Sequence, residues 1–296
     1  MKRLPLFVGF VAASLIVAFK PGLQLLLFAW HTDDQSYILV VPAMAIVLVF
    51  WDRKRIFESV SADIDLRAAY GFAISTVLIA VAYWLPNGTE PQLASAAIGL
   101  VTFWAAAFTL CFGVTAGSAA IFPLGMLACI TPIPAAWIDA VTVALQRGSA
   151  DTVDWLFHAT SVPYLRDGFT FQLAGQGIVV ARECSGIRSS LSLIVLTLVI
   201  AHEALRTIPR RLILIASTLP IVVLKNGVRI VTLTLLAIYV DPSFLNGSLH
   251  HDGGIVFFLI GLLMLTPVLT LLRRSELHKP KLLPQEIARS AKGTHA

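Results

Sequence analysis

The sequence predicts an all-α polytopic membrane protein with about eight transmembrane helices. Hydrophobic residues make up 57% of the 296 residues and charged residues only 13%, and the mean hydropathy is +0.82. This balance is typical of a chain embedded in a bilayer rather than dissolved in water. A helical span needs about 20 mostly apolar residues to cross a hydrocarbon core of roughly 30 Å. Eight segments meet this requirement, at approximately 4–19, 36–51, 68–86, 93–113, 118–138, 185–202, 211–240 and 254–272.

The first of these segments follows Lys2-Arg3, so it has the positive start and apolar run of a secretory signal peptide. No convincing small-residue cleavage site follows it, however, and seven further apolar segments do. We therefore interpret residues 4–19 as a retained first span.

The basic residues predict how the spans are oriented. The net charge is +5 and the pI is near 9.3, but the cations gather at the ends of alternate spans, which is the positive-inside pattern rather than a nucleic-acid-binding surface. With eight spans, both termini are cytoplasmic and the opposite face is periplasmic in a Gram-negative cell. The clusters on the cytoplasmic side are Lys2-Arg3, Arg53-Lys54-Arg55 with Arg67, Arg206 with Arg210-Arg211, and Arg273-Arg274.

The chain shows no internal repeat and no low-complexity tract. We therefore expect one membrane domain over residues 1–272. Residues 273–296 are basic, contain proline and lack a strong period, so they predict a disordered cytoplasmic tail.

A segment on the predicted periplasmic side, 139–184, interrupts the series of spans. Its first part, Ile138 to Tyr164, mixes charged and apolar residues and predicts an amphipathic helix at the membrane surface. Phe169 to Leu173 then alternates apolar and polar residues, and Ile178-Val179-Val180 is β-branched. This pattern predicts a short hairpin that leads directly to Cys184.

Cys184 lies between Glu183 and Arg188, where a polar loop becomes a long apolar helix. A helix N-terminus and neighbouring cations such as Arg182 both stabilise a thiolate, which is the nucleophilic form of cysteine. Ser185 is a suitable cap for the helix. The chain has three cysteines, and the odd number implies no closed disulfide framework. Cys111 and Cys129 lie within apolar spans and are most simply small buried hydrophobes.

Arg229 interrupts the seventh span, together with Lys225 and Asn226. That segment is about 30 residues long and covers roughly 45 Å, and Arg229 lies about 26 Å above Leu212. Ionisable groups at this depth usually face the protein interior or water. Two interpretations follow, since Arg229 either faces a site with Lys225 on the same helix face or extends its side chain to the outer interface.

His250 and His251 stand in a short loop just before the last span. Two loop histidines alone are ordinarily solvated. They lie, however, on the same predicted side of the membrane as Cys184 and Arg229. Together these residues could supply a nucleophile (Cys184), a base (a histidine) and a group that binds the oxyanion or the substrate (Arg229).

These residues carry a resemblance to a known family. Cys184-Ser185-Gly186-Ile187-Arg188, then Asn226-Gly227-Val228-Arg229-Ile230, then His250 with Gly254 and Phe258, resemble the exosortase/archaeosortase family of membrane cysteine transpeptidases. The resemblance implies a catalytic set of Cys184, Arg229 and His250, with His251 as the weaker alternative to His250. Ile255 stands where the family often has an aromatic residue.

The resemblance also implies an activity and partners. The expected substrates are exported proteins with a C-terminal sorting signal: a motif such as Pro-Glu-Pro, a transmembrane helix and a basic end. Cys184 would form an acyl-enzyme at the periplasmic face of the inner membrane, in protein sorting linked to exopolysaccharide or the cell surface. The expected reaction uses no cofactor, and the acyl acceptor is unspecified.

Three alternatives remain open from the residues themselves. A transporter or channel would line a path with Lys225 and Arg229, although such proteins often show internal symmetry. A non-catalytic scaffold for polysaccharide export would not need Cys184. A metal site could use His250, His251, Asp252 and Cys184, but adjacent histidines seldom bind one ion together and no further ligand spacing supports it.

Overall fold

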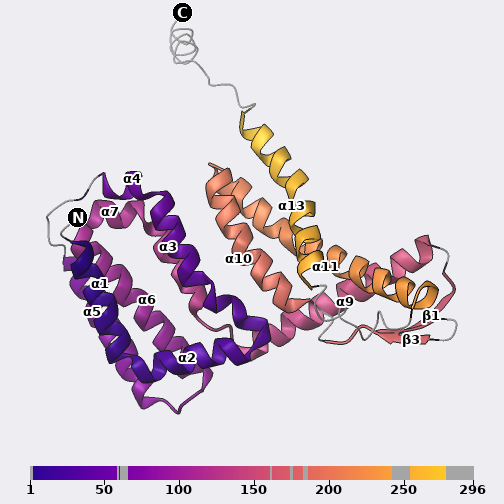
Figure 1. Cartoon of the computed structure of the whole chain (residues 1–296), viewed down its shortest axis with the longest axis horizontal. Helices are drawn as coiled ribbons and strands as arrows, with labels where there is room; N and C mark the ends of the chain where they lie inside the picture. The colour runs from indigo at the N-terminus through magenta and orange to yellow at the C-terminus, as the bar shows by residue number, and fades with distance from the viewer. Residues whose placement is uncertain are drawn as a thin grey trace, which may run out of the picture. The chain divides into compact units, whose positions relative to one another are not determined.

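The computed structural model describes residues 3–58, 60, 66–160, 162–173, 176–182, 186–241 and 254–277. In these ranges the chain is helical apart from one small antiparallel sheet (Figure 1), which confirms the all-α membrane class. The helices are α1 (Leu4–Val17), α2 (Phe19–His31), η1 (Asp33–Leu39), α3 (Val41–Trp51), α4 (Arg53–Phe57), α5 (Leu66–Trp84), α6 (Glu90–Phe112), α7 (Val114–Ala119), α8 (Ile121–Met126), η2 (Leu127–Ile130), α9 (Ala135–Ala159), α10 (Ile187–Ala204), α11 (Ile208–Tyr239) and α13 (Gly254–Leu277).

The protein spans the membrane several times. Among the described residues, five helical segments are long and apolar enough to cross a bilayer, and up to seven if each of two bent pairs counts as one span. Ala68–Trp84, within α5, is a shorter apolar helix. The count of eight spans stays a prediction. The five segments are Asp33–Trp51, Glu90–Phe112, Ile187–Ala204, Ile208–Tyr239 and Ile255–Glu276.

The chain folds as two compact units, which are described separately. The first comprises Met1–Leu145 with Ser185–Val195, and the second Gln146–Cys184 with Leu196–Ala296. The predicted end of the membrane domain at residue 272 stays a prediction, and α13 continues past that point to Leu277.

The predicted first span, residues 4–19, is the first part of a bent pair of helices. The helix α1 ends at Val17, and α2 continues from Phe19 to His31 after a bend of 85°. Pro21 in the first turn of α2 explains the break, since proline has no N–H to donate and its ring clashes with the carbonyl four residues earlier, at Val17.

The predicted span 118–138 is also not one helix. It is divided among α7, α8 and η2, and the direction changes by 92° between Ile121–Ile130 and Ala135–Ala159. Pro132 and Pro134 lie at this break and cannot continue a helix. The buried side chain of Gln35 satisfies the exposed backbone there, because it accepts a hydrogen bond from the N–H of Ile133 (2.7 Å) and donates one to its carbonyl (3.0 Å).

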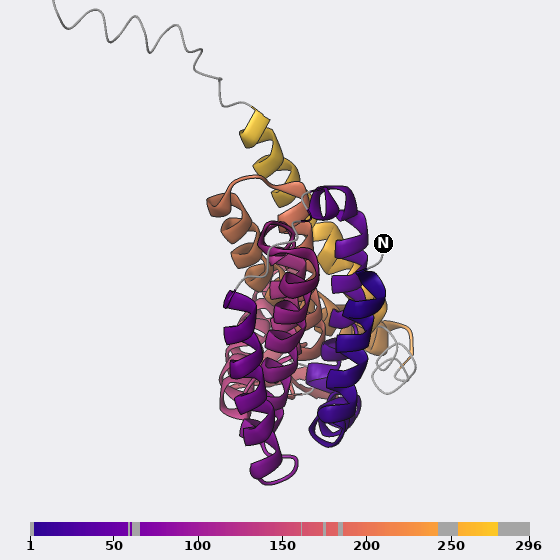
Figure 2. The same ribbon diagram turned by 90° about the vertical axis from the view of Figure 1, so that its left-hand side faces the viewer.

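Small residues allow close helix packing in the first unit. The helices α5 and α6 lie along one another (Figures 1 and 2), and a Cβ at Gly71 would lie 2.8 Å from the Cβ of Ala106. A Cβ at Gly99 would lie 3.0 Å from Ile79. Glycine at these positions brings the two backbones together, as is common between helices in membranes.

The second unit contains the sheet, formed by β1 (Tyr164–Asp167), β2 (Thr170–Leu173) and β3 (Gln176–Val179) in the order β1-β2-β3. The predicted hairpin is confirmed as β2 and β3, while β1 was not predicted. Buried side chains alternate along the strands and pack against α9, so the amphipathic helix has the sheet on its apolar face. The core formed here, called the sheet core below, comprises Ala150, Val153, Phe157, Phe171, Leu173, Ile178, Val180 and Val231.

Candidate functional site

Of the three residues expected to act together, the structure describes one. Cys184 and His250 lie outside the described residues, as does the alternative His251. Arg229 lies on α11 and is partly buried. The site is therefore built from Arg229 and from the described segments of the same unit that precede Cys184 and follow His250. The start of α10 belongs to the other unit and is described by itself.

Arg229 faces the first turn of α13. Its guanidinium carbon lies 5.9 Å from the ring centroid of Phe257, which is at the outer limit of a cation–π contact. Phe257 is buried, and α13 packs along α11. The contact brings Arg229 beside the helix that begins at Gly254, four residues after His250 in the sequence.

The turn of α11 that precedes Arg229 is packed tightly against α9. The side-chain amide of Asn226 is completely buried and donates a hydrogen bond to the Ser149 hydroxyl (3.0 Å). A Cβ at Gly227 would lie 2.6 Å from the Cβ of Thr152, and a Cβ at Gly148 would lie 3.0 Å from Val223. These close approaches fix the rotation of α11 about its axis, and hence the direction in which Arg229 projects.

Lys225 shares a helix face with Arg229, as the four-residue spacing predicted, and is 2% exposed. A buried lysine near a second cation is an expensive arrangement inside a span. It concentrates positive charge in this part of α11, where a thiolate or an oxyanion would be stabilised.

The strand that leads toward Cys184 is held at Val180, the residue after β3. Its N–H donates to the carbonyl of Phe169 (2.9 Å), and its own carbonyl accepts a buried hydrogen bond from Gln146 of α9 (2.6 Å). Val180 belongs to the sheet core, which also contains Val231, and Ile230 packs against the same core. The two residues that follow Arg229 thus share one cluster with the end of the strand.

Gly186 directly precedes α10, which begins at Ile187. The φ angle of Gly186, 76°, lies in the left-handed region that favours glycine. Its carbonyl accepts hydrogen bonds from the backbone N–H (2.9 Å) and the hydroxyl (2.7 Å) of Ser190. Arg188, in the first turn of α10, forms an ion pair with Asp33 (3.1 Å) in which both side chains are well exposed, so it contributes little to stability.

A polar network joins the sheet to α9. Arg166 of β1 forms an ion pair with Asp151 (2.7 Å) and with Asp154 (3.5 Å), and the Tyr164 hydroxyl donates to Asp154 (2.9 Å). Burial and this hydrogen bond raise the pKa of Tyr164 above its ordinary value. The hydrogen bond to Asp151 raises the pKa of Arg166, so this guanidinium remains charged.

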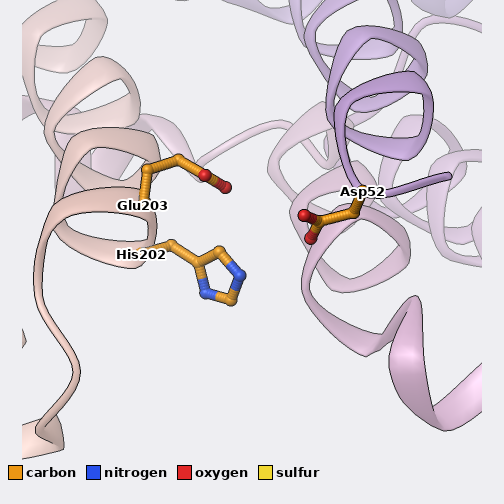
Figure 3. A group of neighbouring side chains, drawn as sticks. All are labelled: Asp52, His202 and Glu203. Atoms are coloured by element: carbon orange, nitrogen blue, oxygen red, sulfur yellow. The ribbon is translucent and has the colours of Figure 1, made fainter. Parts of the chain in front are cut away.

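His202 and Glu203 are neighbours in the last turn of α10 (Figure 3). Arg211 donates a hydrogen bond to the backbone carbonyl of His202 (3.2 Å). Two adjacent residues supply fewer protein ligands than the three or four of zinc sites. Asp52, also drawn in Figure 3, belongs to the other unit. The pair alone therefore gives no basis for a metal assignment.

The fold and these contacts define a multi-pass helical membrane protein with a buried, cationic polar segment in one long span. Residues 30–266 match the family model of the transmembrane exosortases, and the chain belongs to that family. Membership supports a membrane transpeptidase-type role. No curated protein and no solved structure matches the chain.

Three partners of the segment Asn226 to Arg229 were not predicted from the sequence: Ser149, Thr152 and Phe257. A signal for one of them, Thr152, was present, because Gly148 and Thr152 on one helix, and Val223 and Gly227 on another, each repeat a four-residue spacing. Such spacing places residues on one face of a helix. The resemblance singled out Phe258, whereas Phe257 is the residue that contacts Arg229.

Proposed function

We propose that this protein is a membrane cysteine peptidase or transpeptidase that cleaves C-terminal sorting signals through an acyl-enzyme on Cys184. One observation carries the proposal: the segments that flank Cys184 and His250 in the sequence both meet α11 around Arg229. Val180 shares the sheet core with Ile230 and Val231, and Phe257 contacts Arg229 itself.

The reach of the chain supports this assignment. Cys184 is four residues beyond Val180 in the sequence, and four residues of fully extended chain cover at most about 14 Å. Arg229 is the candidate partner of the thiol, because the two residues that follow Arg229 share the sheet core with Val180.

The chemistry assigns a role to each residue. The Cys184 thiolate, whose proton passes to His250, attacks the carbonyl carbon of the scissile peptide bond. Arg229 stabilises the negative oxygen that develops or positions the thiolate. The C–N bond then breaks, the proton on His250 passes to the leaving amine, and a thioester remains on Cys184. An amine or another acceptor, or water, attacks the thioester and releases the product.

The substrates in this proposal are exported proteins that carry a sorting motif, a transmembrane helix and a basic end. The substrate helix lies in the bilayer against the protein, and its motif reaches the periplasmic face of the inner membrane. In this proposal the reaction takes place at that face, in protein sorting linked to exopolysaccharide or the cell surface.

The test is to co-express the chain, as wild type and as Cys184→Ala, with secreted proteins of the same genome that bear such a signal. The mass of each secreted protein reports whether its tail is removed. Cysteine-dependent loss of the tail is expected. Tails lost equally with Cys184→Ala, or retained with both while the protein is correctly inserted, would favour the transporter or scaffold alternative.

A further inference from the structure

The strand β3 forms one edge of the sheet, and it lacks the features that normally protect an edge. In the order β1-β2-β3 it pairs only with β2 among the described residues. Exposed edges are usually protected by charged residues, by proline or by bulges, because their backbone groups can pair with another strand. The residues of β3 are Gln176, Gly177, Ile178 and Val179, with no charge and no proline.

The opposite edge of the same sheet differs. The strand β1 carries Arg166 and Asp167, and Arg166 is held by ion pairs to Asp151 and Asp154. A strand that approached β1 would meet these charged groups, whereas one that approached β3 would not.

The register shows which backbone groups of β3 point outward. Phe171 is opposite Ile178, and Val180 donates its N–H to Phe169. Since hydrogen bonding alternates along an antiparallel strand, residues 178 and 180 bond to β2, while Gly177 and Val179 direct their backbone groups away from it. Both residues are exposed, and a Cβ at Gly177 would have no atom within 4 Å.

The outward edge ends just beyond Val179. The N–H of Ala181 donates to the Val179 carbonyl (2.9 Å), so the chain turns there, three residues before Cys184. Within the described part of the chain, the backbone groups of this edge that stay open are therefore the N–H and carbonyl of Gly177 and the N–H of Val179.

We propose that the edge of β3 binds the extended sorting motif of the substrate as a fourth strand of the sheet. This inference rests on the proposed function. Backbone hydrogen bonds to Gly177 and Val179 would align the motif, and continuity of the chain would bring its scissile bond toward Cys184. Strand addition of this kind is a general mode of peptide recognition.

The Pro-Glu-Pro motif implied by the resemblance fits such an edge. Its prolines are two residues apart, so the nitrogens that lack a hydrogen lie on one side of the strand. The N–H and carbonyl of the glutamate lie on the other side and can face β3. Proline is tolerated where the missing N–H would point to solvent, and the added strand would itself be protected from further pairing.

The test uses a photo-crosslinking amino acid in the full-length protein with Cys184→Ala, which retains the uncut substrate. The probe is a co-expressed secreted reporter with a Pro-Glu-Pro motif, an apolar helix and a basic end. The crosslinker is placed at Gly177 or Val179, and at Leu165 as the matched control. Leu165, Gln172 and Gly177 are paired across the sheet and lie on the same exposed face, so Leu165 tests the opposite edge.

We expect crosslinks from positions 177 and 179 to the reporter's motif, with a yield about tenfold above that from position 165. Equal yields from both edges, or crosslinks only to another part of this chain or to a second copy, would overturn the inference. Cleavage of the reporter by the wild type, measured in parallel, separates the two proposals. If the reporter is cleaved but its motif is not crosslinked, only the proposal of strand addition at β3 is rejected. If no Cys184-dependent cleavage is found, both this proposal and the proposed peptidase or transpeptidase function are rejected.

Discussion

Gly227 lies against Thr152 so closely that a Cβ on the glycine would come within 2.6 Å of the threonine Cβ. The contact joins α11 to α9 one residue after Asn226, whose amide bonds to Ser149. Arg229 lies on the same helix, two residues after Gly227. The glycine of this motif therefore has a packing role that supports the proposed role of its arginine.

Gly227→Ala should separate α11 from α9. The added methyl meets Thr152 on a packed interface, and overpacking of this kind typically costs about 1–3 kcal/mol. We expect a lower thermal midpoint of the purified protein and reduced tail cleavage. Gly9→Ala is the matched control, since a Cβ at that helical position has no atom within 4 Å. Adding Thr152→Gly to the alanine variant should restore part of the loss, and failure of both effects would contradict the packing argument.

Gly186→Ala should strain the start of α10. The φ angle of 76° is costly for a residue with a side chain, by roughly 1–2 kcal/mol. We expect a fall in cleavage with nearly normal membrane insertion, because the change lies at the first turn of one span. Gly125→Ala, at a glycine with no atom within 4 Å of its added Cβ, is the control. Wild-type cleavage by the Gly186 variant would show that this backbone geometry is dispensable.

Arg229→Gln should reduce the rate of cleavage by about 10²–10³, the usual loss when one oxyanion donor is removed. Arg229→Lys keeps the charge but not the planar fork of donors, so it should recover only part of the activity. Quantification of both variants in membranes provides the control for expression. A single-turnover assay with the reporter measures the rate, and an unchanged rate in the glutamine variant would exclude Arg229 from the chemistry.

Tyr164 should make stability depend on pH in the alkaline range. Its pKa is raised in the folded protein by burial and by the bond to Asp154. The folded state therefore holds this proton more tightly than the unfolded state, whose tyrosine has a pKa of about 10. The stabilisation is complete below that value and is lost as the pH rises through the folded pKa. Thermal melts from pH 7 to 11 should show a steeper decline for the wild type than for Tyr164→Phe, and parallel curves would contradict the assignment.

Local sequence patterns predicted those helices and strands that are determined by residues close together in the chain. The long span with Arg229 follows from its apolar length, and β2 and β3 follow from alternation and β-branching. The break at Ala18 was missed, because an apolar run hides a change of direction. Pro132 and Pro134 indicated a kink in the span 118–138, but not a change of direction of 92°. At the second break, the backbone N–H and carbonyl of Ile133 form hydrogen bonds with the side chain of Gln35, which is 98 positions away in the sequence.

The candidate site was predictable to a similar degree. Its cationic member was identified from the cost of placing Arg229 within a span. Its neighbours Ser149 and Phe257 could not be identified, because each is an ordinary residue whose importance depends on which helices meet. Cys184 and His250 stay predictions that the cleavage experiment tests.

The hydrogen bond from Gln146 to the carbonyl of Val180 has a mechanical consequence. A substrate tail paired with β3 would transmit any pull from the exported domain to the end of the strand. At Val180 the load passes through a buried bond into α9, a helix of 25 residues. The anchor would resist displacement of the strand while the tail is under load.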